Sequence, residues 1–573
     1  MYLRPPALAR TGNSLKLIGL VTGVISARLG GLAAWSLLRT LKCVVSVCMR
    51  RFGLGALLGL SVFSSSVRGQ TLYFDVNGTG SGSGVVTGTT YSWGGSFWTA
   101  RSSGSNPGQP AGDWVANADA VFSAGTDAAG SYTITIGADT SVGTVTIQEG
   151  TPVFSVSSGA TWTFDSTTDF ALTSIVNGSG ALAKNNTNTL TLSAANAYTG
   201  ATAVNAGTLA VTVNNALGTN AAGTTVASGA TLDFQNVAYA TAEGLTVNGG
   251  TVATSTGTSS FAGALALGTG GATVNVAGTQ LTLSGAITGA NALTKSGTGT
   301  LVLSNAANAQ TGGTVLSAGG LTVNSGATLG AASGALTVNG GTLALNNTAQ
   351  SVGSFSGTGG TVNFGAGHTL TITQAAATSF TGNLGGTGGL TMSGSGGTLT
   401  LSGTDTYSGL TTISAGTLKF STTTALPTIS SFSLGGGTLQ VGATGTFATS
   451  GTLTLTANST IDFGSGVGAT TISFGNSSAT SWTAGKTLTI TNYNSASGDL
   501  LRVGTTSGGL TSQQLSQIAF SGFSPGASIS STGYLTPGAA IPEPATYAAM
   551  FGTAALFFTR YYRRDRAVVP VAS

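Results

Sequence analysis

The stretch from Gly178 to Leu209, GSGALAKNNTNTLTLSAANAYTGATAVNAGTL, occurs in three related copies along the chain. The second copy, Gly289 to Leu321, reads GANALTKSGTGTLVLSNAANAQTGGTVLSAGGL. The third copy, Gly386 to Leu418, reads GTGGLTMSGSGGTLTLSGTDTYSGLTTISAGTL. Each copy contains Leu-x-Leu, an Asn- or Thr-rich turn, and two glycines seven residues apart. Repetition of this kind predicts one structural unit that is stacked several times.

A shorter period runs through and between these copies. Apolar residues that follow a Gly-x or Gly-Ala-Thr sequence recur at Leu209, Leu232 and Val252, which are 23 and 20 residues apart. Short alternating segments such as Leu190-Thr-Leu192 predict strands with apolar residues inside and Thr or Ser outside. We therefore expect an all-β, right-handed parallel β-helix, a β-solenoid of about 20 coils, with glycine supplying positive φ at the corners.

The repeated skeleton resembles the autotransporter-associated β-strand repeat, also called the passenger-associated transport repeat. The second copy departs from the others, because Gln310 stands where they have Tyr198 and Tyr407. The resemblance implies a large exported bacterial surface protein with a β-solenoid fold.

Composition divides the chain around these copies. We expect an aromatic-rich N-terminal β cap over residues 70–170, a β-helix with the three repeats over 171–430, and C-terminal coils with a cap over 431–536. The aromatic residues of the first part are Tyr73, Phe74, Trp93, Trp98, Trp114, Phe122, Trp162 and Phe164. They are predicted to cover the open end of the solenoid, and the alternative is a platform on which sugar rings stack.

Residues 1–69 have the features of an export segment. Met49-Arg50-Arg51 and the apolar run 52–63 precede small residues, which predicts signal-peptide cleavage between Gly69 and Gln70. Residues 1–48 are then either the result of a start codon assigned too early, with Met49 the true start, or a genuine extension of the signal.

Residues 537–573 form the second targeting segment. Pro542-Glu543-Pro544 precedes an apolar segment, and a helix over 545–562 would be about 27 Å long, barely enough to span a membrane. A basic tail follows it, with Arg560, Arg563, Arg564 and Arg566.

This order of parts resembles the PEP-CTERM sorting signal, although the tail at 565–573 is longer than usual. The resemblance implies processing by an exosortase and delivery to the outer cell surface or the exopolysaccharide matrix, with transient membrane anchoring. A plain C-terminal membrane anchor is the alternative.

Charge and cysteine content exclude several functional classes. The chain has a net charge of +4, but its basic residues crowd the two ends, so we expect no nucleic-acid partner. Both cysteines, Cys43 and Cys48, precede the predicted cleavage site. The mature chain would therefore have no disulfide and no thiolate metal site.

Catalytic chemistry is not expected, and neither is a cofactor or a metal. Between Gln235 and Ser459 the only charged residues are Glu243, Lys295, Asp405 and Lys419, too few for paired carboxylates. The single histidine, His368, is expected to be a solvated turn residue. A weak calcium site among the cap's carboxylates is an alternative involving Asp113, Asp119, Asp127 and Asp139.

Together these features predict a non-enzymatic structural or adhesin-like protein that binds exopolysaccharide or another surface glycan. Two alternatives stay open: an extracellular β-helix enzyme that degrades polysaccharide, and an autotransporter passenger without its own barrel.

Overall fold

The computed structural model describes residues 70–77, 82–102, 112–122, 128, 130–346 and 349–539. These residues form strands and turns almost throughout, with one short α-helix, α3 (Ser512–Ser516), and three 3₁₀ turns, η2 (Thr423–Ala425), η3 (Ser495–Ser497) and η4 (Ser507–Gly509). The described part holds no helix that is long and apolar enough to cross a membrane. Gly69, the Pro542-Glu543-Pro544 motif and the four tail arginines lie outside the described residues.

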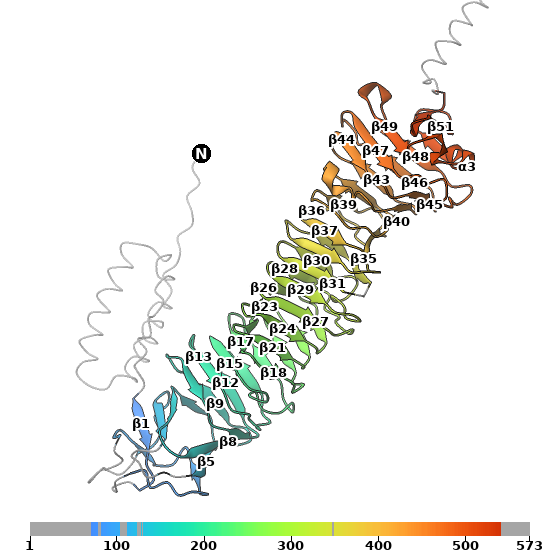
Figure 1. Ribbon diagram of the computed structural model, residues 1–573. Coiled ribbons are helices and arrows are strands. Elements are labelled where there is room, and N and C mark those ends of the chain that lie inside the picture. The colour runs from blue at the N-terminus through green and yellow to red at the C-terminus, as the bar shows by residue number, and fades with distance from the viewer. Residues whose placement is uncertain are drawn as a thin grey trace, which may run out of the picture. The chain divides into compact units, whose positions relative to one another are not determined.

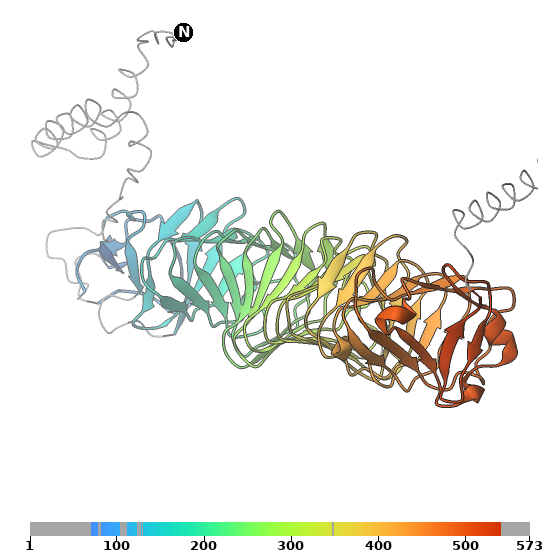
Figure 2. The same ribbon diagram turned by 90° about the horizontal axis from the view of Figure 1, so that it is seen from above.

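The chain winds through three faces in turn, and strands of successive turns pair in parallel along each face (Figures 1 and 2). We number the faces 1 to 3 in the order in which one turn, such as that of β9 (Thr161–Phe164), β10 (Phe170–Leu172) and β11 (Val176–Gly178), crosses them. Face 1 consists of two sheets. Its strands are β6 (Thr140–Val142), β9 (Thr161–Phe164), β12 (Ala181–Lys184), β14 (Thr202–Val204), β16 (Thr224–Val226), β19 (Leu245–Val247), β22 (Leu265–Leu267), β25 (Ile287–Gly289), β32 (Gln350–Val352), β35 (Thr369–Ile372), β38 (Gly389–Met392), β40 (Thr411–Ile413), β42 (Phe432–Leu434) and β45 (Leu453–Leu455).

Face 2 is the longest column of strands. It begins with β3 (Trp98–Thr99), which pairs antiparallel with β1 (Thr71–Phe74), and β1 is followed in parallel by β4 (Asp119–Phe122) and β7 (Val145–Ile147). It continues through β10 (Phe170–Leu172), β13 (Thr189–Leu192), β15 (Thr208–Val211), β17 (Thr231–Phe234), β20 (Thr251–Thr254), β23 (Ala272–Val276), β26 (Leu293–Ser296), β28 (Thr314–Leu316), β30 (Ala335–Val338) and β33 (Ser354–Ser356). It ends with β36 (Thr378–Phe380), β39 (Thr398–Leu401), β41 (Thr417–Phe420), β43 (Thr438–Val441), β46 (Ser459–Asp462), β48 (Leu488–Thr491) and β50 (Ile518–Phe520).

Face 3 completes each turn. Its strands are β2 (Thr90–Ser92), β5 (Ser131–Ile136), β8 (Thr151–Val156), β11 (Val176–Gly178), β18 (Ala238–Tyr239), β21 (Thr258–Phe261), β24 (Gln280–Leu283), β27 (Thr300–Leu303), β29 (Gly320–Val323), β31 (Thr342–Leu345), β34 (Thr361–Phe364), β37 (Asn383–Gly386), β44 (Gly445–Ala448), β47 (Thr470–Phe474) and β49 (Leu500–Val503). At its C-terminal end β52 (Tyr534–Pro537) pairs antiparallel with β49 and with β51 (Ala527–Ile529), so the last pairings differ from the stack before them.

The parallel β-solenoid is thus confirmed. Partners in the central part match the predicted period, since Leu209 pairs with Leu232 and Leu232 with Val252. Turns near the C-terminus are longer, because Ser459 pairs with Leu488, which is 29 residues further on. The longer excursions reduce the number of turns that the same chain length can make.

Strand alternation builds the core. On face 3, Leu281, Leu301, Leu321 and Leu343 lie directly above one another, and all four are fully buried. Each turn contributes one such rung, and the neighbouring residues of the strand point outward. A single turn cannot enclose its own apolar side chains, so the core depends on stacking.

The three repeats do not all start on the same face. Each copy starts at the last residue of a strand (β11, β25 or β37), which we count as its first strand. Five successive pairings on face 2 then lead from β13, the third strand of the first copy, to β26, the second strand of the second copy. Five more lead to β39, again a third strand. The first and third copies therefore share one orientation, and the second is rotated by one face.

The two glycines of each copy have different roles. Gly207, Gly319 and Gly416 have φ of +65°, +69° and +68°, as expected for corners. Gly200 has no positive φ, but a Cβ there would lie 1.9 Å from the carbonyl oxygen of Gly180 in the turn below. The first glycine is thus required by close approach of two backbones, which corrects the expectation that positive φ explains every corner glycine.

Candidate functional site

The most regular feature of the outer surface is a row of threonines on face 2. Thr189, Thr208, Thr231, Thr251, Thr273 and Thr294 are consecutive partners in the parallel ladder. All six are half-buried and belong to the outward-facing positions of their strands. We call these six residues the threonine ladder; it places one hydroxyl per turn, about 4.8 Å apart.

Similar rows occur higher on the solenoid. On face 2, five more threonines pair in register: Thr398, Thr417, Thr438, Thr460 and Thr489. On face 1, six hydroxyl residues pair in register: Ser351, Thr371, Thr391, Thr412, Ser433 and Thr454. The prediction that Thr and Ser line the outside is therefore confirmed for these rows.

Several of the few charged side chains of the middle region are buried. Glu243 and Lys295 are completely enclosed, and Asp405 is only 3% exposed. Lys419 remains half-buried on the outer side of β41. Glu243 and Lys295 therefore add no charge to the surface beside the threonine ladder, whereas the exposed Asp169 accepts a hydrogen bond from the backbone N–H of Thr189 at the first rung.

Two buried lysines donate hydrogen bonds to corner carbonyls from inside the solenoid. The Lys295 Nζ donates to the carbonyl oxygens of Ser296, Gly297 and Ala318 at 2.6, 2.9 and 3.2 Å. Lys184, at the same position of the first copy, binds the corner carbonyls in the same way, and Met392 takes this position in the third copy. Burial lowers the pKa of each lysine to about 8.

Glu243 forms a second internal polar group. Its Oε1 accepts a hydrogen bond from the Thr224 hydroxyl at 2.5 Å, and the Tyr239 hydroxyl lies 3.4 Å from Oε2. Burial raises the pKa of Glu243 to about 7, against the opposing effect of these two hydrogen bonds. No opening leads to this carboxyl, since Glu243, Tyr239 and Thr224 are all buried, so it is a structural group of the core.

His368 corrects one prediction. It was expected to be solvated, but it is 2% exposed in the turn between β34 and β35, where its backbone N–H donates to the Gly365 carbonyl. A Cβ on Gly365 would lie 2.8 Å from the imidazole Cδ2, so the ring packs against that glycine. The prediction was wrong because glycine-rich turns are usually exposed, whereas the His368 side chain points into the solenoid.

The N-terminal aromatic residues form a cluster in the interior. Trp93, Trp98 and Trp162 are almost fully buried, and the Trp98 ring lies 5.1 Å from Trp93 and 4.5 Å from Trp114. The Trp98 indole N–H donates to the Trp93 carbonyl at 2.9 Å. Enclosed ring faces cannot stack on a sugar, so these three tryptophans do not form the carbohydrate platform that the sequence left open, whereas Tyr73 and Trp114 are half-buried.

The carboxylates considered for a calcium site each accept a hydrogen bond from a different part of the chain. Asp113 accepts from the Ser96 hydroxyl, Asp119 from the Thr144 N–H, and Asp139 from the Thr161 N–H. Asp127 lies outside the described residues. In the part of the chain that the structure describes, no three His, Cys, Asp or Glu side chains gather as metal ligands would.

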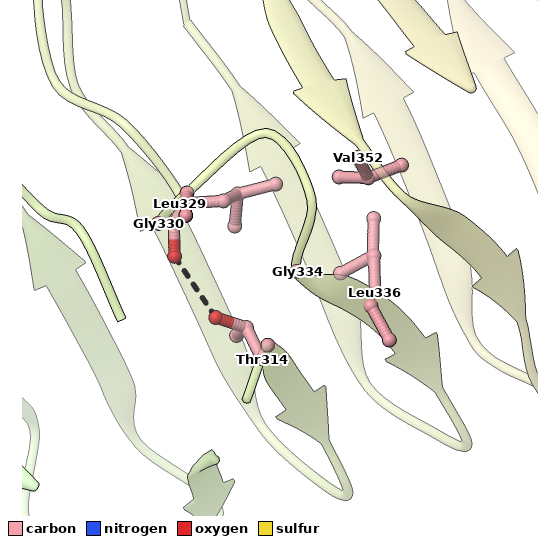
Figure 3. A pocket seen from close by; sticks show the side chains of 9 residues that line it. Thr314, Leu329, Gly330, Gly334, Leu336 and Val352 are labelled. Carbon is pink, nitrogen blue, oxygen red and sulfur yellow. Dashed lines mark hydrogen bonds between the residues drawn. The ribbon is translucent and has the colours of Figure 1, made fainter. Parts of the chain in front are cut away.

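The interior offers little room for a ligand. Figure 3 shows a hollow between successive turns, lined by Thr314, Leu329, Leu336 and Val352, in which the Thr314 hydroxyl donates to the Leu329 carbonyl at 2.9 Å. Its size is that of about one water molecule. Binding is therefore expected on the outer faces of the described solenoid.

Comparison with known families supports the repeat assignment. The family model described as the passenger-associated-transport-repeat matches residues 182–211, 293–323 and 390–420. These ranges cover β12–β15, β26–β29 and β38–β41, within a few residues of the predicted copies. Neither the curated proteins nor the solved structures gave a match to this chain.

The repeats and the β-solenoid fit an autotransporter-like passenger or an adhesin-type surface protein. The repeats also indicate an exported surface protein. The resemblance of the C-terminal segment to a sorting signal stays a prediction.

Proposed function

We propose that the protein is a non-enzymatic structural or adhesin-like protein of the outer cell surface or extracellular matrix, which contacts exopolysaccharide through the threonine ladder on face 2. The observation that carries the proposal is the threonine ladder, an in-register row of six hydroxyls on one face. A polysaccharide is also a linear array of hydroxyls, so many weak contacts would add up along the row.

Charge favours a neutral glycan as the partner. Lys295 is enclosed in the core, and Asp233, the outward neighbour of the ladder in β17, is occupied by hydrogen bonds from Ser255 and Gln235. A polyanionic glycan would instead require exposed basic residues along the same face.

Export and retention belong to the same proposal. The N-terminal segment would direct export with cleavage at Gly69, and an exosortase would process the chain near Pro542-Glu543-Pro544. The buried N-terminal aromatic cluster would act as the cap of the first turns. Mass spectrometry of surface material should find no peptides from 561–573, and intact peptides from that region would contradict the processing step.

The binding step is tested by charge placed on one face. The variant Thr208→Asp/Thr231→Asp/Thr251→Asp should be retained at least tenfold less in affinity electrophoresis through neutral exopolysaccharide. The matched control is Thr371→Asp/Thr391→Asp/Thr412→Asp, which places the same three charges in an in-register row on face 1. Unchanged retention of the first variant, or equal loss in both, would show that the threonine ladder is not the binding face.

A further inference from the structure

One side chain at the same position of each repeat ties three successive turns together. In the first copy, the Asn196 Oδ1 accepts from the Val176 N–H of the turn below at 2.9 Å, and its Nδ2 donates to the Ala216 carbonyl of the turn above at 2.6 Å. Asn308 does the same in the second copy, accepting from the Ile287 N–H at 3.0 Å and donating to the Thr328 carbonyl at 2.8 Å. The side-chain amide thus makes the hydrogen bonds to the turns below and above that a backbone strand would make at this position.

The third copy has Asp405 at this position. Its Oδ1 accepts from the Leu384 N–H of the turn below at 2.8 Å, as the asparagines do. Its backbone N–H donates to the Thr424 carbonyl, which corresponds to the bond from the Asn196 N–H to Asn215. By that register the carbonyl of Ala425 stands where the carbonyl of Ala216 receives the Asn196 amide.

An ionised Asp405 carboxylate has no hydrogen to donate to the carbonyl of the turn above, so the second bond of this link cannot form. Asp405 is 3% exposed, and its Oδ2 is enclosed without a hydrogen-bond partner among the described residues. Asp499, another buried aspartate, differs because its two oxygens each accept a backbone N–H, from Thr470 and Asn494. Two donors suit a carboxylate, whereas a donor on one side and a carbonyl on the other suit a carboxylic acid.

We propose that Asp405 is a neutral carboxylic acid whose Oδ2–H donates to the Ala425 carbonyl, so that the link between these three turns closes in acid and opens when the carboxyl ionises. Ionisation would place an unpaired charge against a carbonyl oxygen in the core, which is strongly unfavourable. The link is therefore a pH-sensitive joint in a solenoid whose other two copies use a group that does not titrate.

The surroundings of Asp405 are consistent with a neutral group. Burial raises the pKa of its carboxyl to about 7, although the bond from Leu384 opposes the shift. The titratable neighbour is Tyr407, whose hydroxyl shares a hydrogen bond of 2.8 Å with Thr411 and whose pKa burial raises far above its usual range. Lys419 lies on the outer side of β41 and offers no internal counter-charge.

The test exchanges the two residue types between copies. In the full chain, hydrogen–deuterium exchange at peptides containing Leu384 and Ala425, corrected for intrinsic rate, should lose at least tenfold protection between pH 5 and pH 9. Asp405→Asn should abolish this loss, and Asn196→Asp should create the same loss at peptides containing Val176 and Ala216. Peptides from the Glu243 region report separately on a second buried acid whose pKa burial raises to about 7.

The proposal is overturned if Asp405→Asn leaves the pH dependence at Leu384 and Ala425 unchanged. It is equally overturned if the wild-type chain keeps its protection there up to pH 9. Should Asn196→Asp fail to fold at either pH, the comparison of wild type with Asp405→Asn still decides the matter.

Discussion

Single residues decide how this neutral solenoid holds the few charges in its core. Lys184 and Lys295 occupy inward positions where an alternating strand calls for an apolar residue, and their stems fill the place that Met392 fills in the third copy. The ammonium groups then meet corner carbonyls that would otherwise lack donors. The same position therefore accepts either a long apolar side chain or a long chain that ends in a donor.

Lys295→Met should change how stability depends on pH. The pKa of Lys295 is about 8 in the folded chain and about 10.5 when unfolded. The neutral amine therefore adds to the free energy of unfolding fully above pH 10.5, and this addition is lost as the pH falls through 8. Between pH 10 and pH 7 the stability of the variant relative to the wild-type chain should therefore rise by roughly 1 to 2 kcal/mol, less than the full shift would give, because solvent screening weakens the effect of burial.

Thermal unfolding at pH 7, 8.5 and 10 measures this effect. Lys419→Met, at an outer position, should leave the profile of the wild-type chain unchanged. Parallel profiles for Lys295→Met and the wild-type chain would show that the buried ammonium does not govern stability in this range.

At the scale of the element, much of the fold could be predicted from the sequence. The alternation at Leu190 and Leu192 and the period from Leu209 to Leu232 reappear as stacked, in-register strands, because both follow from local pattern. The close approach at Gly200 depends on the neighbouring turn, which no local pattern contains. The burial of His368 was not predicted because a glycine-rich turn is usually exposed to solvent. The threonine ladder also required the register, since six threonines become a row only when their turns align.

Gly200→Ala tests the close approach between turns. Its Cβ would lie 1.9 Å from the Gly180 carbonyl oxygen, and neither backbone can move without breaking strand pairs. We expect a loss of about 3 kcal/mol or more in stability, as for severe overpacking. Gly137→Ala, where a Cβ meets nothing within 4 Å and φ is ordinary, should change stability by less than about 0.5 kcal/mol. Similar melting temperatures for the two variants would contradict the argument.

At the scale of the whole solenoid, stability comes from stacking neighbours, so whole turns are interchangeable units. Ten pairings separate β13 from β39, and the matching residues Leu182 and Leu390 are 208 positions apart. The average turn in this part is therefore about 21 residues, and the first and third copies present the same strands to the same faces.

A deletion of residues 182–389 should therefore fold. It joins Ala181 to Leu390 and removes ten whole turns, so β9 receives β38 in place of β12 with the same register. Circular dichroism should show an undiminished fraction of strand, and sedimentation should show a shorter particle. A deletion of residues 182–379, about half a turn out of register, should aggregate; if both behave alike, register does not control assembly.

The rotation of the second repeat also bears on how such a chain can change over generations. Unequal recombination between the gene segments for the first and second copies would remove 111 codons. All turns after the junction would then be rotated by one face about the solenoid axis. Every strand would still find a partner, but most of the threonine ladder lies in the removed interval, and the row from Thr398 to Thr489 would come to lie on a neighbouring face. The number of turns can therefore change by recombination without loss of strand pairing. The outer rows keep their face only when the exchange is between the first and third copies.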